Sequence, residues 1–344
     1  MENITMEISY ASTKIYSTLE EINASKAQQR LPTVIFLTLL MIIGVIGNTL
    51  VIVVYSRKYP PSMFRLYILS LAIIDLLSGV FAMPVEIVDN AYPVMFYSEA
   101  LCKCGRFIGN VFKIGSAFVL VLIAGSRYKK ICRPFSTATT LLQARLYCGA
   151  TILLAIALSW PNAFVQGLKH VHLPGNITGF DCTLDEDIVN TQYPFIYYTI
   201  IFAVNIIVFL LLAVLYTFVI LSLRKHNKNL TTKNLNEKLN KTNPRITKLM
   251  IAITVAFILS YLPNCILDAT STFKRGLALP PSPVVLATLP LLARAFFINN
   301  VINPFIYLVG ESKFRKIVYQ SLRWLYYTIC CPKEKQNKSF AITD

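Results

Sequence analysis

The chain has 344 residues, of which 55% are hydrophobic and 15% are charged, and its formal net charge is +16. Soluble domains average about 45–50% apolar and about 25% charged residues, so this composition argues against an ordinary soluble enzyme. A nucleic-acid-binding protein would explain the basic charge but not the hydrophobicity, whereas a membrane protein with its charge sorted to one side explains both. The composition also excludes a disordered, collagen-like or disulfide-scaffold chain.

Seven apolar runs have the length of about 20 residues that a helix needs to cross a bilayer. They predict an all-α membrane protein, a seven-transmembrane helix bundle. The first 30 residues are polar and lack the apolar region of a cleaved signal peptide, so we expect the first run to direct insertion. The runs are Leu31–Tyr55, Leu66–Val88, Phe107–Ala124, Tyr147–Phe164, Phe195–Leu223, Leu249–Leu267 and Val284–Leu308.

The basic residues predict the orientation. Most of the 33 lysines and arginines lie between runs one and two, three and four, five and six, or after run seven. The positive-inside rule places these segments in the cytoplasm and the N-terminus outside, and a nucleic-acid partner is not needed to explain the charge. We expect an extracellular tail over 1–30, the seven-transmembrane bundle over 31–310, an amphipathic membrane-surface helix over 311–329 and a cytoplasmic tail over 330–344.

Two kinds of modification follow from this topology. Three N-glycosylation sequons, at Asn3, Asn23 and Asn176, fall on the outer side, although unmodified loop asparagines are the alternative. Cys330 and Cys331 directly follow the amphipathic segment and are candidates for palmitoylation; the alternative is a pair of free thiols.

Five motifs recur in order on the predicted spans, and together they resemble the rhodopsin-like (class A) G-protein-coupled receptors over about Leu31–Cys331. The resemblance implies a plasma-membrane receptor, not an enzyme, that passes ligand binding to a heterotrimeric G protein, with arrestin and membrane lipid as further partners. A transporter or channel is the competing class, but broken-helix repeats are not evident. The motifs are Gly44-x-x-Gly47-Asn48, Leu71-Ala72-Ile73-Ile74-Asp75, Ser126-Arg127-Tyr128, Phe257-x-x-Ser260-Tyr261-x-Pro263 and Asn303-Pro304-x-x-Tyr307.

Asp75 predicts an oxygen-lined site at mid-membrane, where a lone carboxylate is costly. Asn299, Asn303 and Tyr307 follow one another at intervals of four residues, so they share one face of span seven. Ser116 lies 11 residues, about three helical turns, before Arg127, so both face inward. In the resembling family such a cage holds Na⁺, which makes Asp75 the metal-binding carboxylate. The alternatives are a protonated Asp75 with water, or neutralisation by Lys113. The expected cage is Asn48, Asp75, Ser116, Asn299 and Asn303.

The family's activation switch maps onto several positions. Arg127 would meet the G protein, and Pro263 removes a backbone hydrogen bond and kinks span six. The acid that usually restrains the arginine is Ser126 here, and its partner position is Asn243, so we hypothesise raised basal signalling. The remaining switch residues are Tyr216, Phe257, Tyr261, Asn303, Pro304 and Tyr307.

The resemblance also implies an outer disulfide. It pairs Cys102, at the top of span three, with Cys182 in the second outer loop, in an oxidising compartment. Cys104 is a close competitor for the same partner.

The expected ligand pocket is rich in charge. Phe297 replaces the lysine that retinal-binding members need, and Gly109 replaces the aspartate of amine receptors, so a neuropeptide is favoured over a small-molecule or lipid ligand. An internal salt-bridge network without a ligand role, for example between Lys113 and Glu86, is the alternative reading. The candidates are Glu86, Asp89, Asn110, Lys113, Asn264, Asp268 and Arg294.

Overall fold

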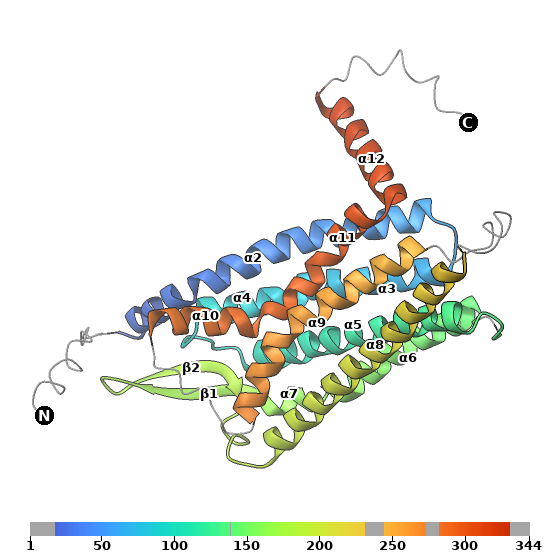
Figure 1. Cartoon of the computed structure of the whole chain (residues 1–344). Helices are drawn as coiled ribbons and strands as arrows, with labels where there is room; N and C mark the ends of the chain where they lie inside the picture. Colours follow the sequence, from blue (N-terminus) through green and yellow to red (C-terminus); the bar gives the residue numbers. More distant parts are fainter. Residues whose placement is uncertain (1–17, 138, 231–243, 273–281, 331–344) are drawn as a thin grey trace, which may run out of the picture.

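The computed structural model describes residues 18–137, 139–230, 244–272 and 282–330. Six of its helices are long and apolar enough to cross a membrane. The bent pair Pro283–Ala293 and Ala295–Gly310 forms a seventh span if the two helices are counted as one. The predicted all-α bundle is confirmed (Figure 1). The helices α2 to α6 are Leu19–Lys58, Met63–Leu77, Met83–Ala91, Glu99–Cys132 and Leu141–Ser159, and α7 to α12 are Asn162–Val165, Tyr193–Leu230, Pro244–Thr272, Pro283–Ala293, Asn299–Gly310 and Ser312–Cys330.

The first helix begins earlier than the sequence predicts. The Thr18 hydroxyl accepts a hydrogen bond from the Glu21 backbone N–H at 3.3 Å, which caps α2 twelve residues before the expected boundary. Residues 19–30, predicted as part of the tail, are therefore helical. The acidic side chains Glu20 and Glu21 favour this start because they lie at the positive end of the helix dipole.

Asn23 anchors this extension. Its side-chain oxygen accepts from the Val94 backbone N–H at 3.3 Å, and its amide nitrogen donates to the Ala91 carbonyl at 3.4 Å. Only 7% of Asn23 is exposed. A glycan on that nitrogen would have to displace both contacts, so burial argues against the glycosylation of Asn23, which stays a prediction. Asn3 lies outside the described residues.

The second span is broken by a wide turn that sets the site. Residues Ser78–Ala82 form a π-helical turn, η2, and the Met83 N–H donates to the Ser78 carbonyl at its end. Pro84 follows, and it has no N–H to continue the regular ladder. The extra residue in a π turn rotates all later side chains about the helix axis. This rotation carries Glu86 and Asp89, on α4, toward the interior.

A β-hairpin covers the outer end of the bundle (Figure 1). Strands β1 (Gln166–Leu173) and β2 (Ile177–Leu184) pair antiparallel from Gln166 opposite Leu184 to Leu173 opposite Ile177. Gly175 and Asn176 turn the chain with φ of 83° and 59°. Asn176 is exposed at this tip, and its glycosylation stays a prediction.

The predicted disulfide is confirmed. Cys182, on β2, is bonded to Cys102, near the start of α5, with 5.6 Å between their Cα atoms. Cys104, the competing partner, is a free and exposed cysteine. The bond ties the hairpin to the outer end of α5.

The main hydrophobic core lies toward the opposite end of the bundle, where α12 leaves it (Figure 1). Tyr55, Tyr307 and Phe314 meet there with ring centroids 5.6–6.1 Å apart and join α2, α11 and α12. Burial of Phe314 and Val318 confirms that α12 packs one apolar face. The Cys330 side chain and Cys331 lie outside the described part of the structure, so palmitoylation stays a prediction.

Candidate functional site

Two carboxylates and two guanidinium groups form a buried network below the hairpin. Glu86 accepts hydrogen bonds from Arg106 and, at 2.8 Å, from Arg294 Nε. Asp89 accepts from Arg106 Nη2 at 2.9 Å and from Arg294 Nη2 at 2.8 Å. The two positive and two negative charges balance, which is how charged groups are tolerated in a low-dielectric interior.

The network confirms that three predicted pocket residues meet, and it corrects their partners. The internal reading paired Glu86 with Lys113, but Glu86 is held by Arg106 and Arg294 instead. Arg106 was missed by the sequence reasoning. A signal was available, because Arg106 lies seven residues before Lys113, which places both on the same face of α5.

Arg106 also connects the network to its surroundings. Its Nη2 donates to the Cys182 carbonyl at 3.2 Å, and its own carbonyl accepts from Asn162 Nδ2 at 3.1 Å. The side chain therefore reaches the disulfide on β2 while its backbone contacts α7. We infer that Arg106 couples the outer loop to α4 and, through Glu86 and Asp89, to Arg294 at the bend that follows α10.

A cavity of about 410 Å³ opens beside this network. Its volume lies within the range of about 300–1,000 Å³ typical of ligand pockets. Of the predicted ligand residues, all but Asp89 line it, and Asn110 donates to the Tyr197 hydroxyl at 2.7 Å on one wall. The charged and amide side chains that line it are Glu86, Arg106, Asn110, Lys113, Asn162, Gln166, Asn264, Asp268 and Arg294.

Lys113 faces this cavity and not the mid-membrane carboxylate. Its Nζ donates to Asn264 Oδ1 and lies 3.9 Å from Asp268 Oδ2. The same nitrogen lies 4.8 Å from the centroid of the Phe296 ring. No hydrogen bond or ion pair joins Lys113 to Asp75 in the described structure, so the idea that Lys113 neutralises Asp75 is contradicted.

Asp75 is buried at the centre of the bundle. It accepts from Ser116 Oγ at 3.3 Å and from Asn303 Nδ2 at 2.8 Å. Asn48, a predicted cage member, instead donates to the Gly44 and Asn300 carbonyls at 2.9 and 2.7 Å. The structure thus brings Ser116 and Asn303 to Asp75 and commits the Asn48 amide nitrogen elsewhere.

Several buried polar atoms near this carboxylate have no protein partner. Buried polar groups are normally satisfied, so this set is suited to ordered water or a small cation. In the described residues no group of three or more His, Cys, Asp or Glu is placed to hold a metal ion, so a cation here would depend on the single Asp75 carboxylate together with amide, hydroxyl and water oxygens. The unpartnered atoms are Asn48 Oδ1, both amide atoms of Asn299, Asn303 Oδ1 and Tyr307 Oη.

Arg127 is buried near the C-terminal end of α5 and lacks an acidic partner among the residues the structure describes. Its guanidinium carbon lies 5.4 Å from the Phe64 ring centroid. The preceding Ser126 hydroxyl donates to the Ile123 carbonyl at 2.7 Å, within its own helix. Asn243, the other half of the missing restraint, lies outside the described residues.

The predicted switch residues of span six lie together on α9. The Phe257 and Tyr261 rings are in tilted contact with centroids 4.3 Å apart, and the Tyr261 hydroxyl donates to the Lys113 carbonyl at 3.3 Å. Pro263 lies inside α9, two residues further on. Nearer the start of α9, the Tyr216 hydroxyl donates to the Met250 carbonyl at 3.4 Å and links α8 to α9.

Comparison with known families decides what this arrangement is. The family described as 7 transmembrane receptor (rhodopsin family) matches residues 47–307. The chain belongs to this receptor family. The receptor is 28% identical to neuropeptide FF receptor 2 of Rattus norvegicus over 290 residues, 80% of this chain and 69% of the relative. It is 27% identical to galanin receptor type 1 of Homo sapiens over 293 residues, 84% and 80% of the two chains.

A third similar protein is a rhodopsin. The receptor is 27% identical over 322 residues to "Rhodopsin, GQ-coupled" of Mizuhopecten yessoensis, and the match covers 89% of this chain but only 62% of the relative. Phe297 occupies the position where retinal-binding members carry their lysine. In this receptor it is buried and lines the outer cavity.

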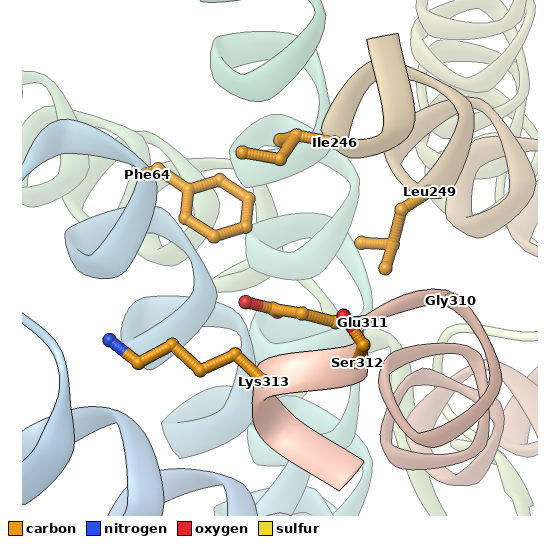
Figure 2. Close-up of a pocket in the computed structure, with 7 residues that line it drawn as sticks. All are labelled: Phe64, Ile246, Leu249, Gly310, Glu311, Ser312 and Lys313. Atoms are coloured by element: carbon orange, nitrogen blue, oxygen red, sulfur yellow. The ribbon is translucent and has the colours of Figure 1, made fainter. Parts of the chain in front are cut away.

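A second cavity, of about 230 Å³, lies at the other end of the bundle, beside the joint between α11 and α12. Figure 2 shows Phe64, Ile246 and Leu249 above the opening and Glu311 below them, with the Lys313 side chain extending to one side. The Glu311 carboxylate accepts from the Tyr55 hydroxyl and, at 2.7 Å, from the Tyr59 hydroxyl. Burial, together with the Glu311 hydrogen bond and charge, raises the pKa of Tyr59, which keeps that hydroxyl a donor. This contact fastens α2 to the joint between α11 and α12.

Proposed function

We propose that this receptor converts the binding of an extracellular, neuropeptide-like ligand into G-protein activation at the plasma membrane. The observation that carries the proposal is the charge-lined cavity at the outer end of the bundle, under the hairpin. The named similarity to neuropeptide FF and galanin receptors supports it. Phe297 argues against light sensing through a retinal Schiff base.

The charge distribution supports a ligand with a basic group. Glu86 and Asp89 are each held by two guanidinium groups, whereas the Asp268 side chain is 42% exposed and has Lys113 at 3.9 Å. The hydrogen bond from His170 lowers the pKa of Glu186, so that outer-loop carboxylate stays charged at neutral pH. Exposed acids near a pocket mouth attract cationic ligands from solution.

Activation would run through α9. In this proposal a ligand at Asp268 and Asn264 acts on the Tyr261–Phe257 pair, α9 bends at Pro263, and its cytoplasmic end moves away from Arg127. Arg127 then contacts the G protein. Arrestin, membrane lipid at α12 and palmitoyl groups on Cys330 and Cys331 belong to the same proposal.

A peptide screen tests the function. Cells expressing the receptor would be challenged with a panel that includes neuropeptide FF, galanin and basic amidated peptides, and dissociation of each G-protein class would be recorded. We expect at least one peptide to activate the receptor and to lose about tenfold or more in potency against Asp268→Asn, because the charge partner is gone. Glu186→Gln serves as a control for loop attraction. Activation only by lipids or small apolar molecules would refute the neuropeptide proposal.

Sodium binding at Asp75 is a separate expectation. If Na⁺ is held by Asp75 with Ser116 and Asn303, raising NaCl at constant ionic strength should stabilise the inactive receptor, measured as a higher melting temperature than in N-methylglucamine chloride. Asp75→Asn should remove that difference. An equal melting temperature of the wild-type receptor in NaCl and in N-methylglucamine chloride would contradict it.

The missing restraint on Arg127 predicts elevated basal signalling. Introducing an acid next to Arg127, in Ser126→Asp, should lower agonist-free nucleotide exchange several-fold, since an ion pair of about 1–3 kcal/mol would favour the inactive state. Ser126→Asn, which has the same shape without the charge, is the matched control. Equal basal activity of both variants at equal surface expression would disprove the hypothesis.

A further inference from the structure

Lys113 is an unusual occupant of the ligand cavity. It lies near the middle of α5, and its side chain is 12% exposed. Its ammonium group meets one amide oxygen, from Asn264, one carboxylate, from Asp268, and the face of the Phe296 ring. A carboxylate, a neutral acceptor and an aromatic face are the groups that proteins use to bind an organic cation.

The acceptors are arranged independently of the lysine. Asn264 Nδ2 donates to the Ala293 carbonyl at 3.1 Å, which fixes Oδ1 as the end that faces Lys113. Asp268 lies one helical turn further along α9, so both acceptors share one face. The Asp268 carboxylate is the more open of the two partners, and its 3.9 Å separation from Nζ is too long for a direct hydrogen bond.

The other acids near the cavity do not offer the same opportunity. Glu86 and Asp89 each accept from both Arg106 and Arg294 at full hydrogen-bonding distance. A ligand cation would have to break two guanidinium contacts to reach either of them. At Asp268 it has to displace one ammonium group, which lies 3.9 Å from the carboxylate.

We propose that Lys113 is a tethered cation that occupies the receptor's own cation-binding site, formed by Asp268, Asn264 and the Phe296 ring, and that a cationic ligand binds by displacing it. This inference rests on the proposed function, because it names the chemistry recognised at that site. The ligand group is a guanidinium or ammonium on a side chain that can reach the site from the outer end. Lys113 thereby sets the affinity threshold that a ligand has to exceed.

Displacement of Lys113 would act directly on the residues next to the hinge at Pro263. The Lys113 carbonyl accepts from the Tyr261 hydroxyl, and its Nζ lies 5.8 Å from the Tyr261 ring centroid. Tyr261 in turn contacts Phe257, below Pro263. When the ammonium leaves, the Tyr261 ring loses the charged group beside its face, and Tyr261 and Phe257 on the kinked helix α9 are freed to move. Occupancy by Lys113 thus favours the inactive arrangement.

A binding titration tests the proposal without depending on signalling. The probe is N-acetyl-arginine amide, a single guanidinium side chain with capped ends, added to purified full-length receptor in lipid nanodiscs while the melting temperature is followed. If Lys113 occupies the site nine times in ten, removing its ammonium in Lys113→Met should lower the dissociation constant about tenfold. The double variant Lys113→Met/Asp268→Asn should lose this gain.

Two controls keep the result specific. Lys103→Met removes a positive charge from the same helix, but from a pair with Glu99 and Asp185 outside the cavity, and should bind the probe as the wild type does. Lys113→Gln, which can still donate to Asn264, replaces Lys113→Met if the latter does not fold. Agonist-free nucleotide exchange should rise several-fold in the Lys113 variant and not in Lys103→Met.

The outcomes separate this proposal from the proposed function. Tighter probe binding by the Lys113 variant, abolished by Asp268→Asn, supports it even if no peptide in the screen activates the receptor. Probe affinity in the Lys113 variant that is equal to or weaker than that of the wild type overturns it.

Discussion

Arg106→Met is expected to reduce the stability of the receptor by about 3–5 kcal/mol, because breaking a buried ion network from one side leaves charge without compensation. Glu86 and Asp89 would share Arg294 alone, in a region where Asp89 is only 3% exposed. The Cys182 carbonyl would also lose its contact with Arg106. The melting temperature of purified receptor and the fraction reaching the cell surface measure the effect.

Removing one acid with the arginine should restore much of that loss. In Arg106→Met/Asp89→Asn, the remaining Glu86 and Arg294 are matched in charge, and we expect the double variant to be more stable than Arg106→Met. The exposed pair of Lys103 and Glu99 is the comparison, and Lys103→Met should cost less than about 1 kcal/mol. Similar melting temperatures for Arg106→Met and Lys103→Met would show that the network is not a structural element.

Loss of the outer disulfide is expected to cost a similar amount. The Cys102–Cys182 bond closes 80 residues of chain, for which the loop-entropy relation gives about 4–5 kcal/mol. In Cys182→Ser, the hairpin loses its covalent attachment to α5, so the roof of the ligand cavity loosens. Surface expression and melting temperature should both fall.

Cys104→Ser provides the matched control for that experiment. Cys104 lies two residues from Cys102 but is free and exposed, so its replacement should leave stability unchanged. The two variants Cys102→Ser and Cys182→Ser should behave alike, since each removes the same bond. Retained stability in Cys102→Ser combined with its loss in Cys104→Ser would mean that the pairing is the other one.

Much of the fold could be predicted from local pattern. The bilayer requires apolar runs of a minimum length with satisfied backbone groups, so hydropathy located the spans. The orientation that the basic loops indicate stays a prediction. The family resemblance correctly predicted the Cys102–Cys182 disulfide. It also predicted that Asp75, Ser116 and Asn303 lie together, and they meet in the structure. Helical spacing is a local property, which explains why these groups were found from the sequence.

The missed features depend on how helices are rotated and where they end. Asn23 looked like a tail asparagine because its partners, Ala91 and Val94, lie far along the chain. Asn48 carried a family motif but donates to backbone carbonyls. Arg106 was overlooked because several inward-facing charges competed for the same partners.

The sequence by itself determined that the chain crosses a membrane as a helical bundle and that ionisable side chains gather near one end of it, and it predicts which end is cytoplasmic. Only the tertiary structure decided how those charges pair. The π turn before Pro84 rotates Glu86 and Asp89 toward Arg106 and Arg294, and this leaves Lys113 to Asn264 and Asp268. The physical reason is that a buried ion pair depends on separations of a few ångströms between different helices, which neither composition nor spacing along one helix specifies.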